Sequence, residues 1–240
     1  MKFKDILARA MRPADGKPVA LDVRDLDEGE AEILLYDQIG FWGITAEEFR
    51  RQLSAIEADT IHLRIDSPGG DVFMARAMKT ALEQHSAKIV AHIDGLAASA
   101  ASYIMLGADE IEMAQGAFLM IHNAWMITLG DAVDHSDSAA MLTKIDGSIR
   151  ADYAAKSGKS AEYFAPLMDA ETWFDADEAL AEGLIDRIYQ KDGGAENRFD
   201  LSIFDNAPEA LTAPDPAEEV AEAHRARQMR KLDIIDRLAS

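Results

Sequence analysis

The amino-acid sequence predicts an α/β domain with a mostly parallel sheet. Short apolar strands alternate with amphipathic helices, and each helix follows its strand within a few residues, as in βαβ units. The length of 240 residues suits one domain of about 200 residues with appendages. Because the patterning weakens at both ends, we expect an N-terminal arm over residues 1–30, the domain over 31–190, and a linker with a charged helical tail over 191–240.

Local signals define the first elements of the predicted domain. A continuous apolar run predicts a strand at 33–36, and Thr45 then begins a helix through a capping box with Glu48. Alternating apolar and polar residues over 61–66 predict the next strand. That strand ends at Ser-Pro-Gly-Gly, and a helix is expected over about 71–84.

The middle of the chain continues the alternation. A strand is expected at 89–93, and a run of alanine, serine and apolar residues over 96–106, entered through Gly95, predicts a buried helix. Short strands are expected at 111–113 and 118–121.

The last third of the domain is mainly helical. Helical spacing of apolar residues predicts a long helix over 131–157, stopped by Gly158, and Ser160 caps a further helix. A helix within 173–183 then precedes a last strand at 184–189. Beyond that strand, paired glycines and several prolines mark the linker.

Composition excludes several classes of function. The chain has no cysteine, which excludes disulfides, zinc–thiolate sites, iron–sulfur clusters and a cysteine nucleophile. The 44 acidic residues outnumber the 24 basic ones, and the net charge of -20 repels nucleic-acid phosphates. No apolar run approaches the roughly 18 residues of a membrane span, and the first residues are too polar for a secretory signal. We expect a soluble, cytoplasmic protein with no nucleic-acid or membrane partner.

The first strand-to-helix junction that could carry chemistry is Ser67-Pro68-Gly69-Gly70. Paired glycines permit positive φ and let backbone N–H groups approach a bound group. A phosphate loop is disfavoured because no Lys-Ser or Lys-Thr follows the glycines. A plain tight turn between strand and helix is the alternative explanation.

The second junction lies at residues 94–102 and places Ser99 in the first turn of the predicted buried helix. Unsatisfied N–H groups at a helix N-terminus can stabilise an oxyanion if Ser99 attacks a carbonyl carbon. Close packing of small residues is the alternative explanation. Gly95 and Ser99 do not form the Gly-x-Ser-x-Gly turn of the α/β-hydrolases, so that fold is disfavoured.

A serine nucleophile needs a base, and the base needs an orienting acid. His122 ends an apolar strand, and the carboxyl ends of strands are where α/β active sites gather. A structural histidine is the alternative at that position. For the acid, Asp169, Glu171 and Asp175 lie together in one stretch before a helix.

Four segments occur in order along the chain: IDSPGGDVFMA, DGLAASAAS, MIHNAW and ETWFDADEALAEGLID. At this spacing they resemble the Clp protease proteolytic subunit (ClpP) family, and above all the ClpP-like head-maturation proteases of phages and prophages. The resemblance spans residues 31–190. It implies a ClpP/crotonase-type spiral of repeated ββα units, with a protruding handle helix over 131–157.

The resemblance also assigns roles to site residues. It implies that Ser99 is the nucleophile and His122 the general base. The third member departs from the family pattern, because Glu171 aligns where the family has an aspartate. Asp169 is the alternative acid.

The same resemblance implies a serine endopeptidase that needs no cofactor and no metal. The backbone N–H groups of Gly70 and Ala100 would form the oxyanion hole. A strand around 128–130 would be the segment along which a peptide substrate lies as an added strand.

Partners follow from the resemblance as well. It implies a homo-oligomer of stacked rings, a heptamer or tetradecamer, whose sites face an interior chamber. Capsid or scaffold proteins are the expected substrates, which would place the protein in the cytoplasm or within an assembling phage head. An unfoldase ATPase is a further partner that the resemblance suggests.

Three rivals share parts of this pattern. Crotonase-like acyl-CoA enzymes have the same architecture, but the pair Ser99 and His122 fits hydrolysis better. Signal-peptide peptidases use a Ser–Lys dyad and normally carry a membrane anchor. A catalytically silent ring or scaffold component is the third, since Glu171 replaces the usual aspartate.

Overall fold

The computed structural model describes residues 21–26, 29–41, 43–189, 199, 201, 203–208 and 211. The chain divides into two compact units, residues 1–206 and 207–240. All the helices and strands named below belong to the first unit. The charged helix expected in the C-terminal tail lies outside the described residues.

The described strands form one sheet with the order β1-β2-β3-β4-β5-β8, and β6 pairs with both β4 and β7. All pairs are parallel except β1 with β2 and β6 with β7. This arrangement confirms the predicted α/β class with a mostly parallel sheet. The strands are β1 (Asp22–Asp25), β2 (Glu30–Leu35), β3 (Thr60–Ser67), β4 (Lys88–Ala98), β5 (Glu110–Ala114), β6 (Phe118–Ile121), β7 (Thr172–Phe174) and β8 (Arg187–Tyr189).

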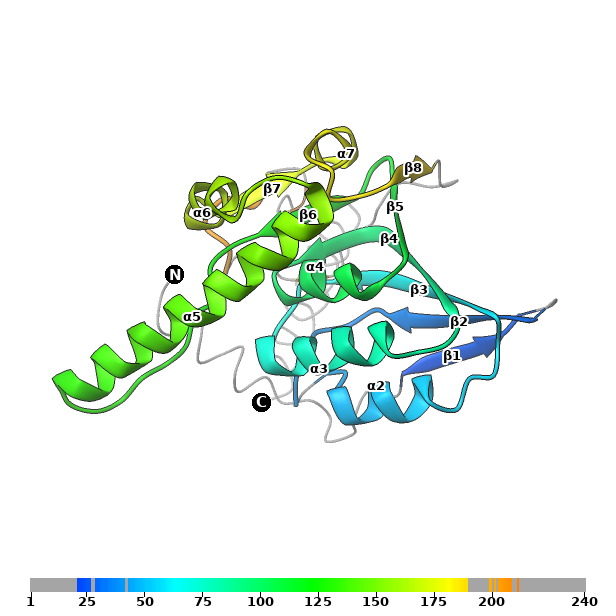
Figure 1. Cartoon of the computed structure of the whole chain (residues 1–240), viewed down its shortest axis with the longest axis horizontal. Helices are drawn as coiled ribbons and strands as arrows, with labels where there is room; N and C mark the ends of the chain where they lie inside the picture. Colours follow the sequence, from blue (N-terminus) through cyan, green and yellow to red (C-terminus); the bar gives the residue numbers. More distant parts are fainter. Residues whose placement is uncertain are drawn as a thin grey trace, which may run out of the picture. The chain divides into compact units, whose positions relative to one another are not determined.

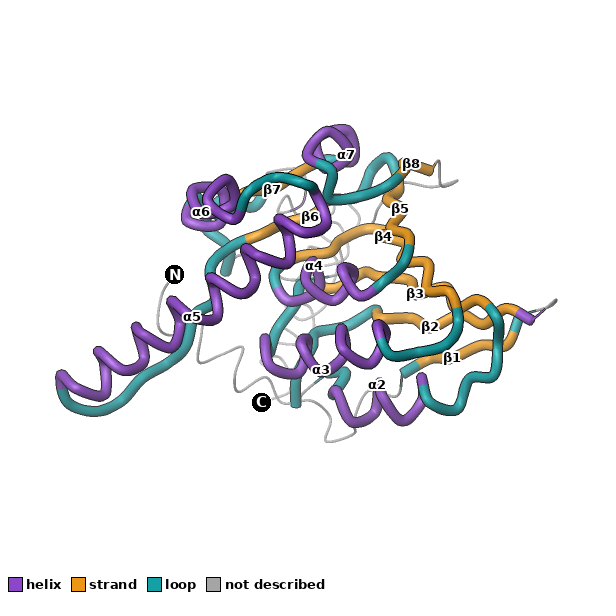
Figure 2. Tube along the Cα trace, viewed as in Figure 1, coloured by secondary structure: helices purple, strands orange, loops and turns teal. Residues whose placement is uncertain are grey.

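Helices α2, α3 and α4 lie along one face of the sheet (Figures 1 and 2). Their apolar residues, such as Phe49 and Met78, join Ile33, Leu63 and Ile93 of the strands in one fully buried core. The helices are α2 (Ala46–Leu53), α3 (Val72–Glu83), α4 (Ala100–Ile104), α5 (Ala132–Ser157), α6 (Ala161–Asp169) and α7 (Ala176–Glu182), and a short 3-10 turn, η2 (Met105–Gly107), follows α4.

Local capping signals position most helices where the sequence predicts them. Asp71 caps α3 by accepting hydrogen bonds from two backbone N–H groups of the first turn. Asp131 forms a capping box with Asp134 at the start of α5, and Gly158 ends that helix in a left-handed conformation. The predicted box at Thr45 is only half formed, because the Glu48 carboxylate binds Arg51 and Gln52 of the next turn instead.

The buried helix predicted over 96–106 is wrong in its first part. Strand β4 continues through Asp94 and Gly95 to Ala98, and α4 begins only at Ala100. The strand changes partners on the way: residues 90–93 pair with β5, and residues 96–98 pair with β6. These backbone hydrogen bonds override the helix propensity of the alanines.

Other differences lie at the sheet margins. β1 lies within the predicted N-terminal arm, so the sheet begins before residue 31. β7 was not predicted, and it occupies the start of the segment expected to be helical. The strand expected at 128–130 is absent, because these residues pair with no strand among those described.

α5 divides into an exposed half and an anchored half. It extends away from the sheet at its N-terminal end (Figure 1), and residues 132–144 are almost all exposed. Ile145, Ile149 and Tyr153, which share one face, are buried against the core. The long helix predicted over 131–157 is confirmed.

The face of β4 away from the helices carries partly buried polar residues. Asp94 accepts hydrogen bonds from Arg64, Tyr36 and Tyr189, which come from three other segments. Burial raises the pKa of Tyr36 and Tyr189, so both remain donors. These bonds fix β4 at the position where it changes partners.

Candidate active site

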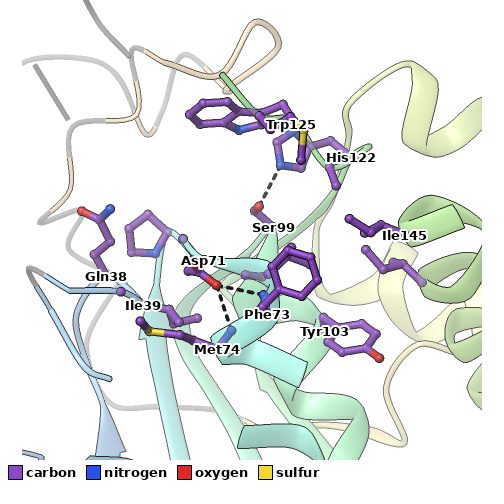
Figure 3. A pocket seen from close by; sticks show the side chains of 18 of the residues that line it. Gln38, Ile39, Asp71, Phe73, Met74, Ser99, Tyr103, His122, Trp125 and Ile145 are labelled. Atoms are coloured by element: carbon purple, nitrogen blue, oxygen red, sulfur yellow. Dashed lines mark hydrogen bonds between the residues drawn. The ribbon is translucent and has the colours of Figure 1, made fainter. Parts of the chain in front are cut away.

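A cavity of about 440 Å³ lies where two strand-to-helix junctions, the end of β6 and the face of α5 meet. Ser99 and His122 point toward one another at its edge (Figure 3). Apolar side chains from α3 and α5, including Phe73 and Ile145, line the rest. A cavity that is largely apolar and contains a few convergent polar groups is typical of a substrate site.

Ser99 occupies the turn between β4 and α4, with φ of 55° and ψ of -122°. A side chain at positive φ is strained by about 1–3 kcal/mol. Hydrogen bonds hold the turn: the Ser99 N–H donates to the Met120 carbonyl at 2.9 Å, and the Ser102 hydroxyl donates to the Ser99 carbonyl at 2.6 Å. The turn aims the Ser99 side chain into the cavity (Figure 3).

His122 follows β6 directly and reaches Ser99 across the junction. Its Nε2 lies 2.7 Å from Ser99 Oγ, which is hydrogen-bonding distance. β6 pairs in parallel with the end of β4, so the two strands deliver both side chains to the same edge. The structure therefore brings together the predicted nucleophile and the predicted base.

Burial lowers the pKa of His122, and the nearby Glu171 carboxylate raises it by a smaller amount. The imidazole is therefore neutral at neutral pH. A neutral ring with Nε2 facing a hydroxyl can accept its proton.

The two predicted acids lie differently. Asp169 is exposed and accepts a hydrogen bond from the Asn123 side chain at 2.7 Å. Glu171 is half-buried, at a φ of 50°, and its charge acts on His122. No hydrogen bond joins either acid to His122 in the described part of the chain. Of the two, Glu171 is the one whose charge favours the protonated ring.

The N–H groups of Gly70 and Ala100 belong to residues that line the same cavity as Ser99. Ala100 is the first residue of α4, where N–H groups lack partners within the helix. Gly69 lets the two junctions approach closely, because a Cβ there would lie 2.7 Å from the Ala100 nitrogen and 2.8 Å from Ser99 Cβ. Residues of both junctions thus line the cavity beside Ser99.

Several residues at the site carry no sequence signal. Phe204 packs on His122 although it lies in the predicted linker. The buried pair Ser102 and Tyr153 joins α4 to α5 through a 2.7 Å hydrogen bond. The sequence around Ser102 indicates only close packing of small residues. Nothing in the proline-containing linker predicts that Phe204 contacts the site.

The described residues contain no group of three or more His, Asp or Glu side chains that could hold a metal ion. Within the same part of the chain, no helix combines the length and apolar character that membrane crossing requires.

A half-buried serine–histidine pair beside backbone N–H groups that can act as donors is the arrangement of serine hydrolases. The family model for Clp protease matches residues 22–192. The chain therefore belongs to the Clp protease family, and its relatives imply a peptidase.

Curated relatives are similar at low identity. The ATP-dependent Clp protease proteolytic subunit of Porphyromonas gingivalis is 26% identical over 188 residues, covering 72% of this chain and 85% of the relative. Proteolytic subunit 2 of Treponema denticola is 30% identical over 162 residues, covering 65% and 78%. Proteolytic subunit 3 of Rhodococcus jostii is 30% identical over 131 residues, covering 53% and 64%.

Proposed function

We propose that the protein is a serine endopeptidase in which Ser99 is the nucleophile, His122 the general base and Glu171 the acid that orients the histidine. The observation that carries the proposal is the 2.7 Å contact between Ser99 Oγ and His122 Nε2 in a cavity that Gly70 and Ala100 also line. Asp169 is the less suitable acid, because it is exposed, whereas Glu171 is half-buried and its charge acts on His122.

The proposed reaction begins when His122 Nε2 takes the hydroxyl proton as Ser99 Oγ bonds to the peptide carbonyl carbon. The carbonyl oxygen becomes an oxyanion that the N–H groups of Gly70 and Ala100 stabilise. The C–N bond breaks as the imidazolium gives its proton to the leaving amine. Water then attacks the acyl-enzyme by the same steps in reverse order and regenerates the serine.

The proposal extends to assembly and substrates. α5 supports a role as the handle of a ring oligomer, because its first half is exposed in the single chain. Relatives named as ATP-dependent subunits support an unfoldase ATPase as a partner. The likeness to head-maturation proteases favours capsid or scaffold proteins as substrates and the cytoplasm, or an assembling phage head, as the location.

A fluorophosphonate probe tests the nucleophile. The wild type is expected to be labelled at Ser99 and to cleave peptides, whereas Ser99→Ala is expected to lose labelling and at least 10⁴-fold in kcat. Mass spectrometry of the labelled peptide and a fluorogenic peptide assay measure both effects. Proteolysis that persists in Ser99→Ala would sink the assignment, and coenzyme A binding without proteolysis would favour an acyl-CoA enzyme instead.

Paired substitutions test the acid. Glu171→Gln is expected to lower kcat by about 10²–10⁴, since it removes the charge that stabilises the imidazolium. Asp169→Asn serves as the matched change on the exposed neighbour and should leave kcat close to wild type. The reverse ranking in a peptide assay would transfer the role to Asp169.

A further inference from the structure

A short segment from the predicted linker lies against the site. Ile203 and Phe204 are each only 7% exposed, and both line the cavity that contains Ser99 and His122. The segment enters the site from a part of the chain beyond β8, the last strand of the sheet. Its burial shows that it is part of the wall of the cavity.

Phe204 contacts two rings of the site at once. Its ring centroid lies 5.8 Å from that of His122 and 5.6 Å from that of Trp173, with interplanar angles of 78° and 79°. Both are edge-to-face contacts, an arrangement that aromatic rings prefer. Phe204, itself buried, therefore packs on the His122 ring and restricts its movement.

Asn206 contacts the proposed acid. Its backbone N–H donates to Glu171 Oε1 at 2.7 Å, and the Trp173 indole N–H donates to the same oxygen at 3.3 Å. The Asn206 side chain also donates to the Ala170 carbonyl at 2.7 Å. A glutamate has one more rotatable bond than an aspartate, so these donors restrict a carboxylate that would otherwise sample more positions.

We propose that Phe204 and Asn206 are positioning residues of the active site: Phe204 holds and shields His122, and the Asn206 N–H fixes the Glu171 carboxylate. This proposal rests on the proposed function. It also accounts for the glutamate at the acid position, because the segment supplies the support that a longer side chain requires. A segment that blocks the site instead is the competing explanation.

The environment of His122 provides a readout that packing alone would not change. Glu171 is the charged group that acts on the ring, while Asp169 and Asp146 bind the neighbouring residues Asn123 and Ala124. Because burial lowers the pKa of His122, removing Phe204 should raise it toward the ordinary value.

The test uses full-chain variants and two measurements: NMR titration of the His122 ring, and fluorophosphonate labelling rates across pH. Phe204→Ala should raise the His122 pKa and slow labelling about tenfold or more, since small displacements of a catalytic group cost up to about 100-fold. Phe204→Leu should bring both the His122 pKa and the labelling rate most of the way back to their wild-type values. Leu201→Met changes another buried side chain of the segment while conserving its volume, and it should match the wild type.

A second pair tests the backbone donor. Asn206→Pro removes the N–H and should slow labelling by about 10- to 100-fold. Asn206→Ala keeps the N–H and should slow labelling less.

Two results with Phe204→Ala would contradict the proposal. Faster labelling would mean that the segment blocks the site, and an unchanged labelling rate with an unchanged His122 pKa would mean that the segment has no role in the site. Either result overturns the proposal. If the wild type is not labelled, the proposed function fails, and the NMR titration still decides whether Phe204 controls His122.

Discussion

The junction after β3 and the junction after β4 both turn a strand into a helix beside the cavity, but they use different residues. The first has glycines at positive φ, 86° at Gly69 and 147° at Gly70, and the second has a serine at 55°. Glycine adopts such φ values without strain, whereas Ser99 does so at a cost. A junction that offers only backbone N–H groups needs no side chains, so glycines suit the first junction. The role proposed for Ser99 needs a hydroxyl, so glycine cannot replace serine in the second junction.

Steric fit makes the two junctions dependent on one another. A Cβ at Gly69 would lie 2.5 Å from the Ala98 carbonyl oxygen, and one at Gly70 would lie 1.9 Å from the Ile39 carbonyl oxygen. Real Cβ atoms essentially never approach so closely, so the chain must shift if either is added. The missing Cβ of Gly69 therefore sets how closely the first junction approaches Ser99, whereas that of Gly70 lets the chain pack on Ile39.

Among changes at the two junctions that leave Ser99 in place, the largest effect is expected from Gly69→Ala. The added methyl group would push the first junction away from Ser99, lowering kcat/KM by about 100-fold and the free energy of unfolding by about 1–3 kcal/mol. A peptide assay and urea denaturation measure the two losses.

Gly147→Ala is the matched control, because a Cβ there meets nothing within 4 Å in α5. It should raise the stability slightly and preserve activity. If Gly69→Ala and Gly147→Ala have the same kcat/KM and the same free energy of unfolding, the close approach of the two junctions does not matter for activity or stability.

A smaller effect is expected on stability at the second junction, where two substitutions of Ser99 separate backbone strain from loss of the hydroxyl. Ser99→Gly and Ser99→Ala should both lack hydrolysis, but the glycine variant should be about 1 kcal/mol more stable, since it relieves the strain at φ of 55°. The entropy of glycine in the unfolded chain offsets part of that gain. An alanine variant as stable as the glycine variant in urea denaturation would argue against strain at Ser99.

The smallest effect concerns pH and compares His122, which follows β6, with His92 in the middle of β4. His122 must be neutral to act as a base, so the acid limb of kcat/KM should lie below the ordinary histidine pKa of about 6.5. Burial, assisted by the charge of Arg64, lowers the pKa of His92 within β4 to about 4.

The unfolded chain binds more protons than the folded one between those two values, so stability should fall as pH drops from about 6.5 to 4. His92→Gln should flatten that fall in urea denaturation at several pH values and leave the acid limb of kcat/KM in place. A moved acid limb would mean that the sheet and the site titrate together.

Local signals predicted much of the fold. Alternation over 61–66, helical spacing of apolar residues over 71–84 and 131–157, and the stop at Gly158 are short-range features, and β3, α3 and α5 lie where these features predict them. The boundary of α4 depends on long-range pairing between β4 and β6, which no local pattern carries.

The site was predictable to a different degree in each part. Ser99 and His122 could be paired because both follow strands and match family segments. The contacts of Glu171 could not, since its donors come from Trp173 and from Asn206, the latter in a segment without regular structure. The packing of Phe204 depends on tertiary contacts alone.

The exposed half of α5 has a consequence for the isolated chain. A helical segment with few tertiary contacts is marginal in water, so its amide hydrogens should exchange with solvent much faster than those of the anchored half. Val133 and Met141, at 66% and 48% exposed, present apolar side chains to water in this half of the helix. Slowed exchange in this half as protein concentration rises would report, residue by residue, that a second chain has covered it.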